Sequence, residues 1–170
     1  MKIDYNSLEK KIRVNFKNKD LLVRSLTHKS YDKEKNYEKI EFLGDRVLGL
    51  IISKKLLEIY PHEKEGILDK KFASLVNKKT CLDIAKKINL QKYILILNTR
   101  DKKNSIEDKV LSDSCEALIG SIYLDKGFTV TENFILTLWK DNIKKSIITE
   151  IDAKTKLQEF SLKKFKKLPT

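Results

Sequence analysis

The stretch that decides the fold is YEKIEFLGDRVLGLIISKKLLEI, residues 37–59, which ends two residues before Pro61. It contains no proline, and its apolar residues cover most of the helical circumference rather than one stripe, which is typical of a buried helix. Proline disfavours helical backbone in the residue before it, so the helix should end near Ile59. We therefore predict a long central helix with an apolar middle formed by Ile40, Phe42, Leu43, Val47, Leu48, Leu50, Ile51 and Ile52.

Shorter segments with helical periodicity lie on both sides of this helix. One run, Tyr93–Leu97, has strand character, a polar loop that we expect to be mobile follows it, and Asp125–Gly127 has the composition of a turn. The whole chain has only five glycines and two prolines, which favours helices. The predicted fold class is all-α, with further helices over 7–16, 21–31 (capped by Asp20), 67–77, 80–88, 106–124 and 131–148.

The balance of charge points to a polyanionic partner. The chain has 36 basic and 24 acidic residues, a net charge of +12, which attracts nucleic acid at physiological salt. The same lysines would also suit an ordinary solvated surface, so charge alone decides little. Two cysteines without a secretory leader, and no apolar run long enough to span a bilayer, lead us to expect a cytoplasmic protein without membrane contact.

Carboxylates interrupt the apolar surface of two predicted helices. Glu38, Glu41 and Asp45 are spaced i, i+3 and i+7, which places them within about 60° of one another on the central helix. Asp113 and Glu116 are spaced i, i+3 on a second apolar helix. Unpaired buried carboxylates are costly, because each loses hydration and repels its neighbours. If the two helices face each other, the acids would form a cage for a cation.

Oxygen ligands of this kind select a hard divalent ion, Mg²⁺ with Mn²⁺ as a substitute, over zinc. Such an ion can activate a bound water and neutralise charge on a phosphodiester, so no side-chain nucleophile is needed. The sequence therefore favours metal-dependent phosphodiester hydrolysis.

Other interpretations of these residues are weaker. The acids could pair with Arg24 or Arg46 inside the fold, but four acids on two apolar helices would need several buried cations, and within the two segments only Arg46 is available. A di-iron bundle would need Glu-x-x-His pairs, and neither His28 nor His62 stands in one. Neither histidine stands in a nucleophile motif with serine or cysteine. Whether Arg46 pairs with an acid or contacts a ligand stays open.

Four segments, in order along the chain, resemble the ribonuclease III family. The resemblance covers Leu21 to Asp125, and its most specific part is the segment from Tyr37 to Leu48. It implies an all-helical homodimer with two metal sites that cut one strand each of a double-stranded RNA, leaving 5′-phosphates and short 3′ overhangs. The matching segments are Leu26–Ser30, Tyr37–Leu48, Glu65–Gly66 and Leu111–Gly120.

The resemblance also assigns roles to residues. It implies that Glu41, Asp45, Asp113 and Glu116 bind the metal, with Asp45 and Glu116 central to catalysis. Two further acids, Glu38 and Glu65, match acidic positions near the family's cleft, although a solvated role or a dimer contact fits them equally. Phe42–Gly44 matches a segment that helps to form the dimer contact in the family. Processing of ribosomal RNA precursors and messenger RNA is the role that the family implies.

The last part of the chain carries a second resemblance. Residues 149–170 are similar to a linker followed by the first helix of a double-stranded-RNA-binding domain, which would place Thr155 and Gln158 against RNA. Most of that domain is absent, so we expect residues 1–148 to form the nuclease domain and to bind RNA weakly and in a salt-dependent way. A protein that binds RNA without cutting it, and a helical protein with structural ion pairs, are the competing interpretations.

Overall fold

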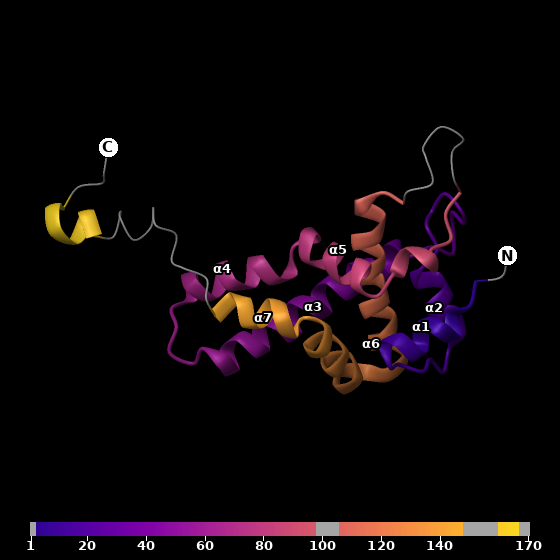
Figure 1. Ribbon diagram of the computed structural model, residues 1–170, viewed down its shortest axis with the longest axis horizontal. Coiled ribbons are helices and arrows are strands. Elements are labelled where there is room, and N and C mark those ends of the chain that lie inside the picture. Colours follow the sequence, from indigo (N-terminus) through magenta and orange to yellow (C-terminus); the bar gives the residue numbers. More distant parts are fainter. Residues whose placement is uncertain (1–2, 98–105, 148–159, 167–170) are drawn as a thin grey trace.

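The computed structural model describes residues 3–97, 106–147 and 160–166, and these residues contain no β-strand longer than a single bridge. The all-α prediction is confirmed. Residues 160–165 also form a short helix. The named elements, shown in Figure 1, are α1 (Tyr5–Ile12), α2 (Lys19–Ser25), α3 (Glu38–Ile59), α4 (Glu65–Val76), α5 (Lys78–Lys87), the 3₁₀ helix η1 (Leu90–Lys92), α6 (Asp108–Leu138) and α7 (Lys140–Ile147).

Helices α3 and α6 form the centre of the molecule and cross at two glycines. A Cβ atom on Gly44 would lie 1.8 Å from the backbone oxygen of Glu116, and one on Gly120 would lie 2.4 Å from the backbone oxygen of Ile40. Because glycine has a hydrogen atom where other residues have a Cβ, glycine at these two positions allows the two backbones to approach this closely. In Figure 1, α1 and α2 lie at one end of the crossing pair and α4 and α7 lie toward the other.

The apolar residues of α3 are divided between the core and the surface. Val47, Leu48, Ile51, Ile52 and Leu56 are buried with the apolar half of α6, as predicted for the central helix. In contrast, Phe42, Leu50 and Leu57 are more than half exposed, so the helix is not buried on all sides.

The packing of α5 and α7 completes the core. Cys81 of α5 and Cys115 of α6 are buried free thiols, in agreement with their expected role as small core residues. Trp139, which follows α6, is fully buried, and its indole Nε1 donates a hydrogen bond to the Leu75 carbonyl at 2.9 Å. Lys71 of α4 donates from its ammonium to the Ser146 carbonyl of α7. These contacts hold α7 against α4.

Several predicted boundaries are wrong, and each error has a local cause. Helix α1 ends at Ile12 rather than Phe16, because Arg13 takes a left-handed conformation with φ of 56°. Asn18, not Asp20, caps α2 by accepting a hydrogen bond from the Asp20 backbone N–H. The expected turn at Asp125–Gly127 is a kink within α6, where Gly127 has φ of 75°.

The run with strand character forms one parallel bridge. The Leu95 N–H donates to the Leu26 carbonyl at 2.8 Å, and the His28 N–H donates to the Leu95 carbonyl at 2.8 Å. The polar loop after it, and the predicted RNA contacts Thr155 and Gln158, lie outside the described residues. Within the described ranges, no helix is both long and apolar enough to cross a membrane.

Candidate metal centre

Three carboxylates from the two central helices converge beside the glycine crossing. Glu41 comes from α3, and Asp113 and Glu116 come from α6, and one oxygen of each lies within 4.8 Å of the others. The side chains of Asp113 and Glu116 are only 2% and 3% exposed, whereas Glu41 is 23% exposed. The predicted convergence of acids from two helices is therefore present, with the α6 acids at the base.

The crossing of α3 and α6 fixes this arrangement. Gly44 follows Glu41 by three residues, and its Cα lies against the backbone of Glu116 itself. The carboxylates are thus attached to two helices whose backbones are in direct contact, and the other residues of α6 from Val110 to Gly120 are apolar or small. Rigid helices with such a contact hold their side chains in a defined geometry.

Two lysines, Lys78 of α5 and Lys109 of α6, neutralise the cluster. The Lys78 Nζ lies 2.6 Å from Asp113 Oδ1, 2.9 Å from Glu116 Oε2 and 3.3 Å from Glu41 Oε1. The Lys109 Nζ lies 2.6 Å from Asp113 Oδ2. The sequence argument that too few cations lie near these acids is therefore wrong. It considered Arg24 and the two apolar segments, whereas Lys78 begins α5 and Lys109 precedes the apolar part of α6.

Asp45 and Arg46 lie at the mouth of the site. Asp45 is 46% exposed and accepts a hydrogen bond at 2.8 Å from Arg46, whose guanidinium stacks 4.0 Å from the centre of the Phe42 ring. Asp45 is outside the three-carboxylate cluster and lies in the cleft beside it rather than in the interior. It lines a hollow of about 330 Å³ beside the cluster. The residues that line this hollow are Glu38, Glu41, Phe42, Asp45, Arg46, Lys78 and Glu116.

The two accessory acids lie in different surroundings. Glu38 is on the rim of the hollow, half exposed, with its carboxylate 3.0 Å from the Lys29 ammonium. Glu38 is therefore solvated, one of the roles that the sequence left open for it, and lies at the edge of the cleft rather than in the interior. Glu65 is an exposed residue at the start of α4 and does not line the hollow.

Burial and the lysines shift the titration of the cluster in opposite directions. Burial raises the pKa of Glu116, and burial together with the negative charge of Asp113 raises the pKa of Glu41. Burial would raise the pKa of Asp113 also, but hydrogen bonds from Lys109 and Lys78 outweigh it and lower that pKa. For Lys78, burial acts to lower the pKa, and the hydrogen bonds to Asp113 and Glu116 reverse this and raise it. The cluster therefore favours a bound positive charge.

The donor set fits a hard divalent cation. Its three nearest groups are carboxylates, the ligand class that Mg²⁺ and Mn²⁺ prefer. The same three oxygens already contact a cation, the Lys78 ammonium, which shows that their geometry suits a central positive charge.

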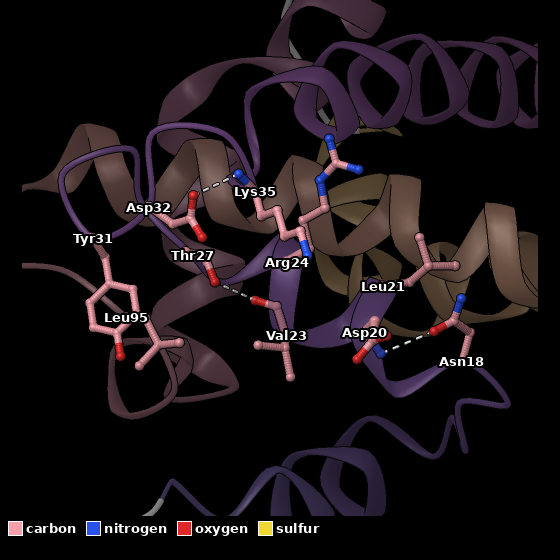
Figure 2. Close-up of a pocket in the computed structure, with 10 residues that line it drawn as sticks. All are labelled: Asn18, Asp20, Leu21, Val23, Arg24, Thr27, Tyr31, Asp32, Lys35 and Leu95. Carbon is pink, nitrogen blue, oxygen red and sulfur yellow. Dashed lines mark hydrogen bonds between the residues drawn. The ribbon is translucent and has the colours of Figure 1, made fainter.

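A larger hollow beside α2, of about 460 Å³, has no such convergence (Figure 2). Its polar groups make local contacts: Thr27 donates to the Val23 carbonyl, and Asp32 accepts from the backbone N–H of Lys35. The Arg24 guanidinium donates to the Asn36 carbonyl rather than to an acid. These polar groups of the hollow are thus engaged in turns and caps, and the acidic hollow at the helix crossing is the better candidate site.

Sequence analysis missed both lysines of the site: Lys109 stands four residues before Asp113 on the same helix, a spacing that could have revealed it, whereas Lys78 could not be found in this way. One lysine in a lysine-rich chain carries no pattern, and its contact depends on where α5 packs. The nearest local signal is Asn77, which caps α5 by accepting a hydrogen bond from Thr80 and so fixes where that helix begins.

Comparisons with known proteins agree with this geometry. A family described as Ribonuclease-III-like matches residues 18–142. Ribonuclease 3 of Pelagibacter ubique is 66% identical over 169 residues, which cover 99% of this chain and 76% of that protein. The nuclease domain of ribonuclease III from Campylobacter jejuni is 38% identical with a TM-score of 0.77, over 83% of this chain and 99% of that one. Dicer from Pichia stipitis shares the fold, with 20% identity, a TM-score of 0.63, and coverage of 85% of this chain and 68% of that one. On these matches, the chain belongs to the ribonuclease III family.

Proposed function

We propose that this chain is a divalent-metal-dependent endoribonuclease that hydrolyses both strands of double-stranded RNA and leaves 5′-phosphates with short 3′ overhangs. The observation that carries the proposal is the convergence of Glu41, Asp113 and Glu116 beside a solvent-open hollow. Membership of the ribonuclease III family supports the choice of substrate. A protein that only binds RNA is less well supported, because all four predicted metal-binding acids are present.

Glu41, Asp113 and Glu116 would hold the ion, with Asp45 at the mouth of the hollow as a fourth acid. Bound there, Mg²⁺, or Mn²⁺ in its place, would supply an activated water and neutralise the charge that develops on the phosphodiester. Asp45 and Glu116 would be the acids closest to the chemistry.

The side chains around the cluster have separable tasks. Asp113 is held by two lysines, so its carboxylate stays ionised and fixed in position. Arg46 holds one oxygen of Asp45 and is itself held by the Phe42 ring, which keeps the Asp45 carboxylate at the entrance. The burial of Glu116 excludes water from the base of the site and strengthens its attraction for a cation.

We further propose a homodimer formed through the exposed apolar face of α3. Phe42, Leu50 and Leu57 lie on one side of this helix, within about 80° of one another. Exposed apolar side chains arranged in this way are typical of a protein interface. The Campylobacter jejuni nuclease domain is described as having a region involved in dimer formation. Two copies would bring two acidic hollows to one RNA duplex.

The remaining assignments rest on the family resemblance. Residues 1–148 would form the nuclease domain, and residues 149–170 a linker and the first helix of an RNA-binding domain, in which Thr155 and Gln158 would contact RNA. Glu38 and Glu65 would be accessory acids, and ribosomal RNA precursors and messenger RNA would be the substrates.

Cleavage of an end-labelled, perfectly paired RNA duplex at low salt tests the proposal. The chain with Mg²⁺ should release products with staggered ends, and the Glu116→Gln variant should release none while keeping its circular dichroism spectrum. Chelation should stop cleavage, and Mn²⁺ should restore it. Binding of the duplex without cleavage by the unchanged chain would instead support the binding-only protein.

A further inference from the structure

One ammonium group occupies the centre of the carboxylate cluster. The three donors of the Lys78 Nζ are directed at three different carboxylates, one each on Asp113, Glu116 and Glu41. Lys109 differs, because it contacts only the other oxygen of Asp113, from one turn earlier on the same helix. Of these two lysines, only Lys78 contacts all three acids.

The placement of Lys78 allows its ammonium to leave. Its side chain is 56% exposed although its Nζ touches two acids that are almost fully buried, so the stem runs from solvent into the cluster. Its backbone is fixed at the start of α5, where Asn77 caps the helix and Cys81, Ile84 and Ala85 are buried. Rotation of the side chain can therefore withdraw the ammonium without any movement of the helix.

A divalent ion and this ammonium cannot share the same oxygens. Asp113 Oδ2 is engaged by Lys109, so Oδ1, the atom that Lys78 contacts, is the one directed toward Glu116 and Glu41. Two cations held a few ångströms apart by one set of carboxylates would repel strongly in so buried a place. The doubly charged ion would satisfy the acids better than the singly charged ammonium.

We propose that Lys78 is a built-in counter-ion that occupies the divalent ion's position in the metal-free protein and must be displaced before the ion binds. Lys78 therefore lowers the metal affinity of the site and stabilises the metal-free fold. This inference rests on the proposed function in that it takes the cluster as the metal centre.

Isothermal titration calorimetry of Mn²⁺ binding to the RNA-free chain tests whether the ion displaces Lys78. The Lys78→Ala variant should bind Mn²⁺ about tenfold more tightly or better, since a competing state is removed. Lys79→Ala is the matched control: it removes the same charge from the next residue of α5, which is exposed, and it should change the affinity by less than about twofold. Lys78→Arg should bind Mn²⁺ more weakly than the unchanged chain, because a guanidinium pairs more firmly with carboxylates.

Thermal unfolding provides a readout that does not depend on the affinity. In the presence of a chelator, the Lys78→Ala variant should unfold at a lower temperature than the unchanged chain. Saturating Mn²⁺ should raise the unfolding temperature of this variant by more than it raises that of the unchanged chain. If the Lys78→Ala variant does not fold in the presence of chelator, the Mn²⁺ affinity of the Lys78→Arg variant still tests the inference, and an affinity no weaker than that of the unchanged chain would overturn it. Equal Mn²⁺ affinities for the Lys78→Ala and Lys79→Ala variants, or weaker binding by Lys78→Ala, would overturn the inference. Absence of Mn²⁺ binding by every variant would overturn the proposed metal centre as well.

Discussion

At the scale of single residues, the acids of the hollow differ in what they contact, and this separates their roles. Asp45 lies at the mouth of the hollow, and its charge acts on Glu116, whereas Glu38 forms an exposed ion pair with Lys29. Exposed ion pairs contribute little to stability, and Glu38 is not one of the three converging acids.

Asp45→Asn should therefore lower the rate of RNA cleavage by about a hundredfold or more, because removal of a group that only orients a metal ligand already costs about 10- to 100-fold and Asp45 is proposed to be closer to the chemistry. Glu38→Gln should leave the rate within about threefold, which makes it the matched control. Single-turnover cleavage of a labelled duplex at saturating Mg²⁺ measures both rates. Equal losses in the two variants would show that Glu38 belongs to the site.

The sequence predicts the acids of the hollow but not their partners. Glu41, Asp113 and Glu116 are identified by helical spacing on apolar segments, and the structure brings these three together. Their pairing with Lys78 depends on the packing of α5 against α6, which no local pattern encodes. The same limit applies to Asp45, whose exposure follows from which side of α3 faces α6.

At the scale of elements, the backbone contact between α3 and α6 determines how far apart the acids lie. A methyl group on Gly44 would overlap the backbone oxygen of Glu116, so it could be accommodated only if the two helices separate. Gly49, on the same helix, differs: a Cβ there would lie 3.4 Å from the Phe72 ring, a side chain that can adjust.

Gly44→Ala should lower the free energy of unfolding by about 3 kcal/mol or more, because the overlap is with backbone. It should also weaken Mn²⁺ binding, since Glu41 moves away from the α6 acids. Gly49→Ala should change stability by less than about 1 kcal/mol. Urea unfolding of the three proteins, with Mn²⁺ titration of the folded ones, tests this; a stable Gly44→Ala with unchanged metal affinity would contradict it.

A second contact between elements should make stability depend on pH. Asp125, before the kink of α6, accepts hydrogen bonds at 2.8 Å from the backbone N–H groups of Lys17 and Asn18, before α2. Burial would raise the pKa of Asp125, but these hydrogen bonds and Lys126 outweigh it and lower the pKa below its ordinary value of 3.8. The folded state therefore binds fewer protons than the unfolded state, and stability is lost as pH falls through the folded pKa.

Asp125→Asn should lower the free energy of unfolding by about 1–3 kcal/mol at pH 7, because one charged hydrogen bond is lost. The difference from the unchanged chain should shrink as pH falls below about 4, where the carboxylate becomes protonated in the unfolded chain and then in the folded one. Urea unfolding of both proteins at pH 7, 5 and 3.5 measures this difference in stability. A difference that stays constant over this range would show that the charge of Asp125 is not involved.

The elements themselves are predictable to different degrees. The bounds of α3 are predicted to within one residue, because its apolar pattern is long and Pro61 follows. The end of α1 is not, because Glu9 accepts a hydrogen bond from the Phe16 N–H and folds that segment back onto the helix. An interaction of this kind depends on the path of the chain rather than on periodicity.

At the scale of the whole molecule, the exposed apolar face of α3 should control assembly. Leu50→Glu should give a monomer, because it places a charge within the proposed dimer contact, and it should leave the monomer folded since Leu50 is not in the core. Leu124→Glu, an exposed leucine on α6, is the control and should remain a dimer. Analytical ultracentrifugation distinguishes the two states, and a dimeric Leu50→Glu would place the contact elsewhere.

The Lys78 ion pairs also affect the order in which the protein matures. Small domains whose metal ligands have no other partner fold only when the metal arrives. In the proposed metal centre the acids already have an ammonium partner, so a newly made chain would complete its fold first and take up its ion later. Under this proposal, synthesis of the folded chain would be independent of the cellular supply of divalent metal, and that supply would determine only how much of the finished protein is active.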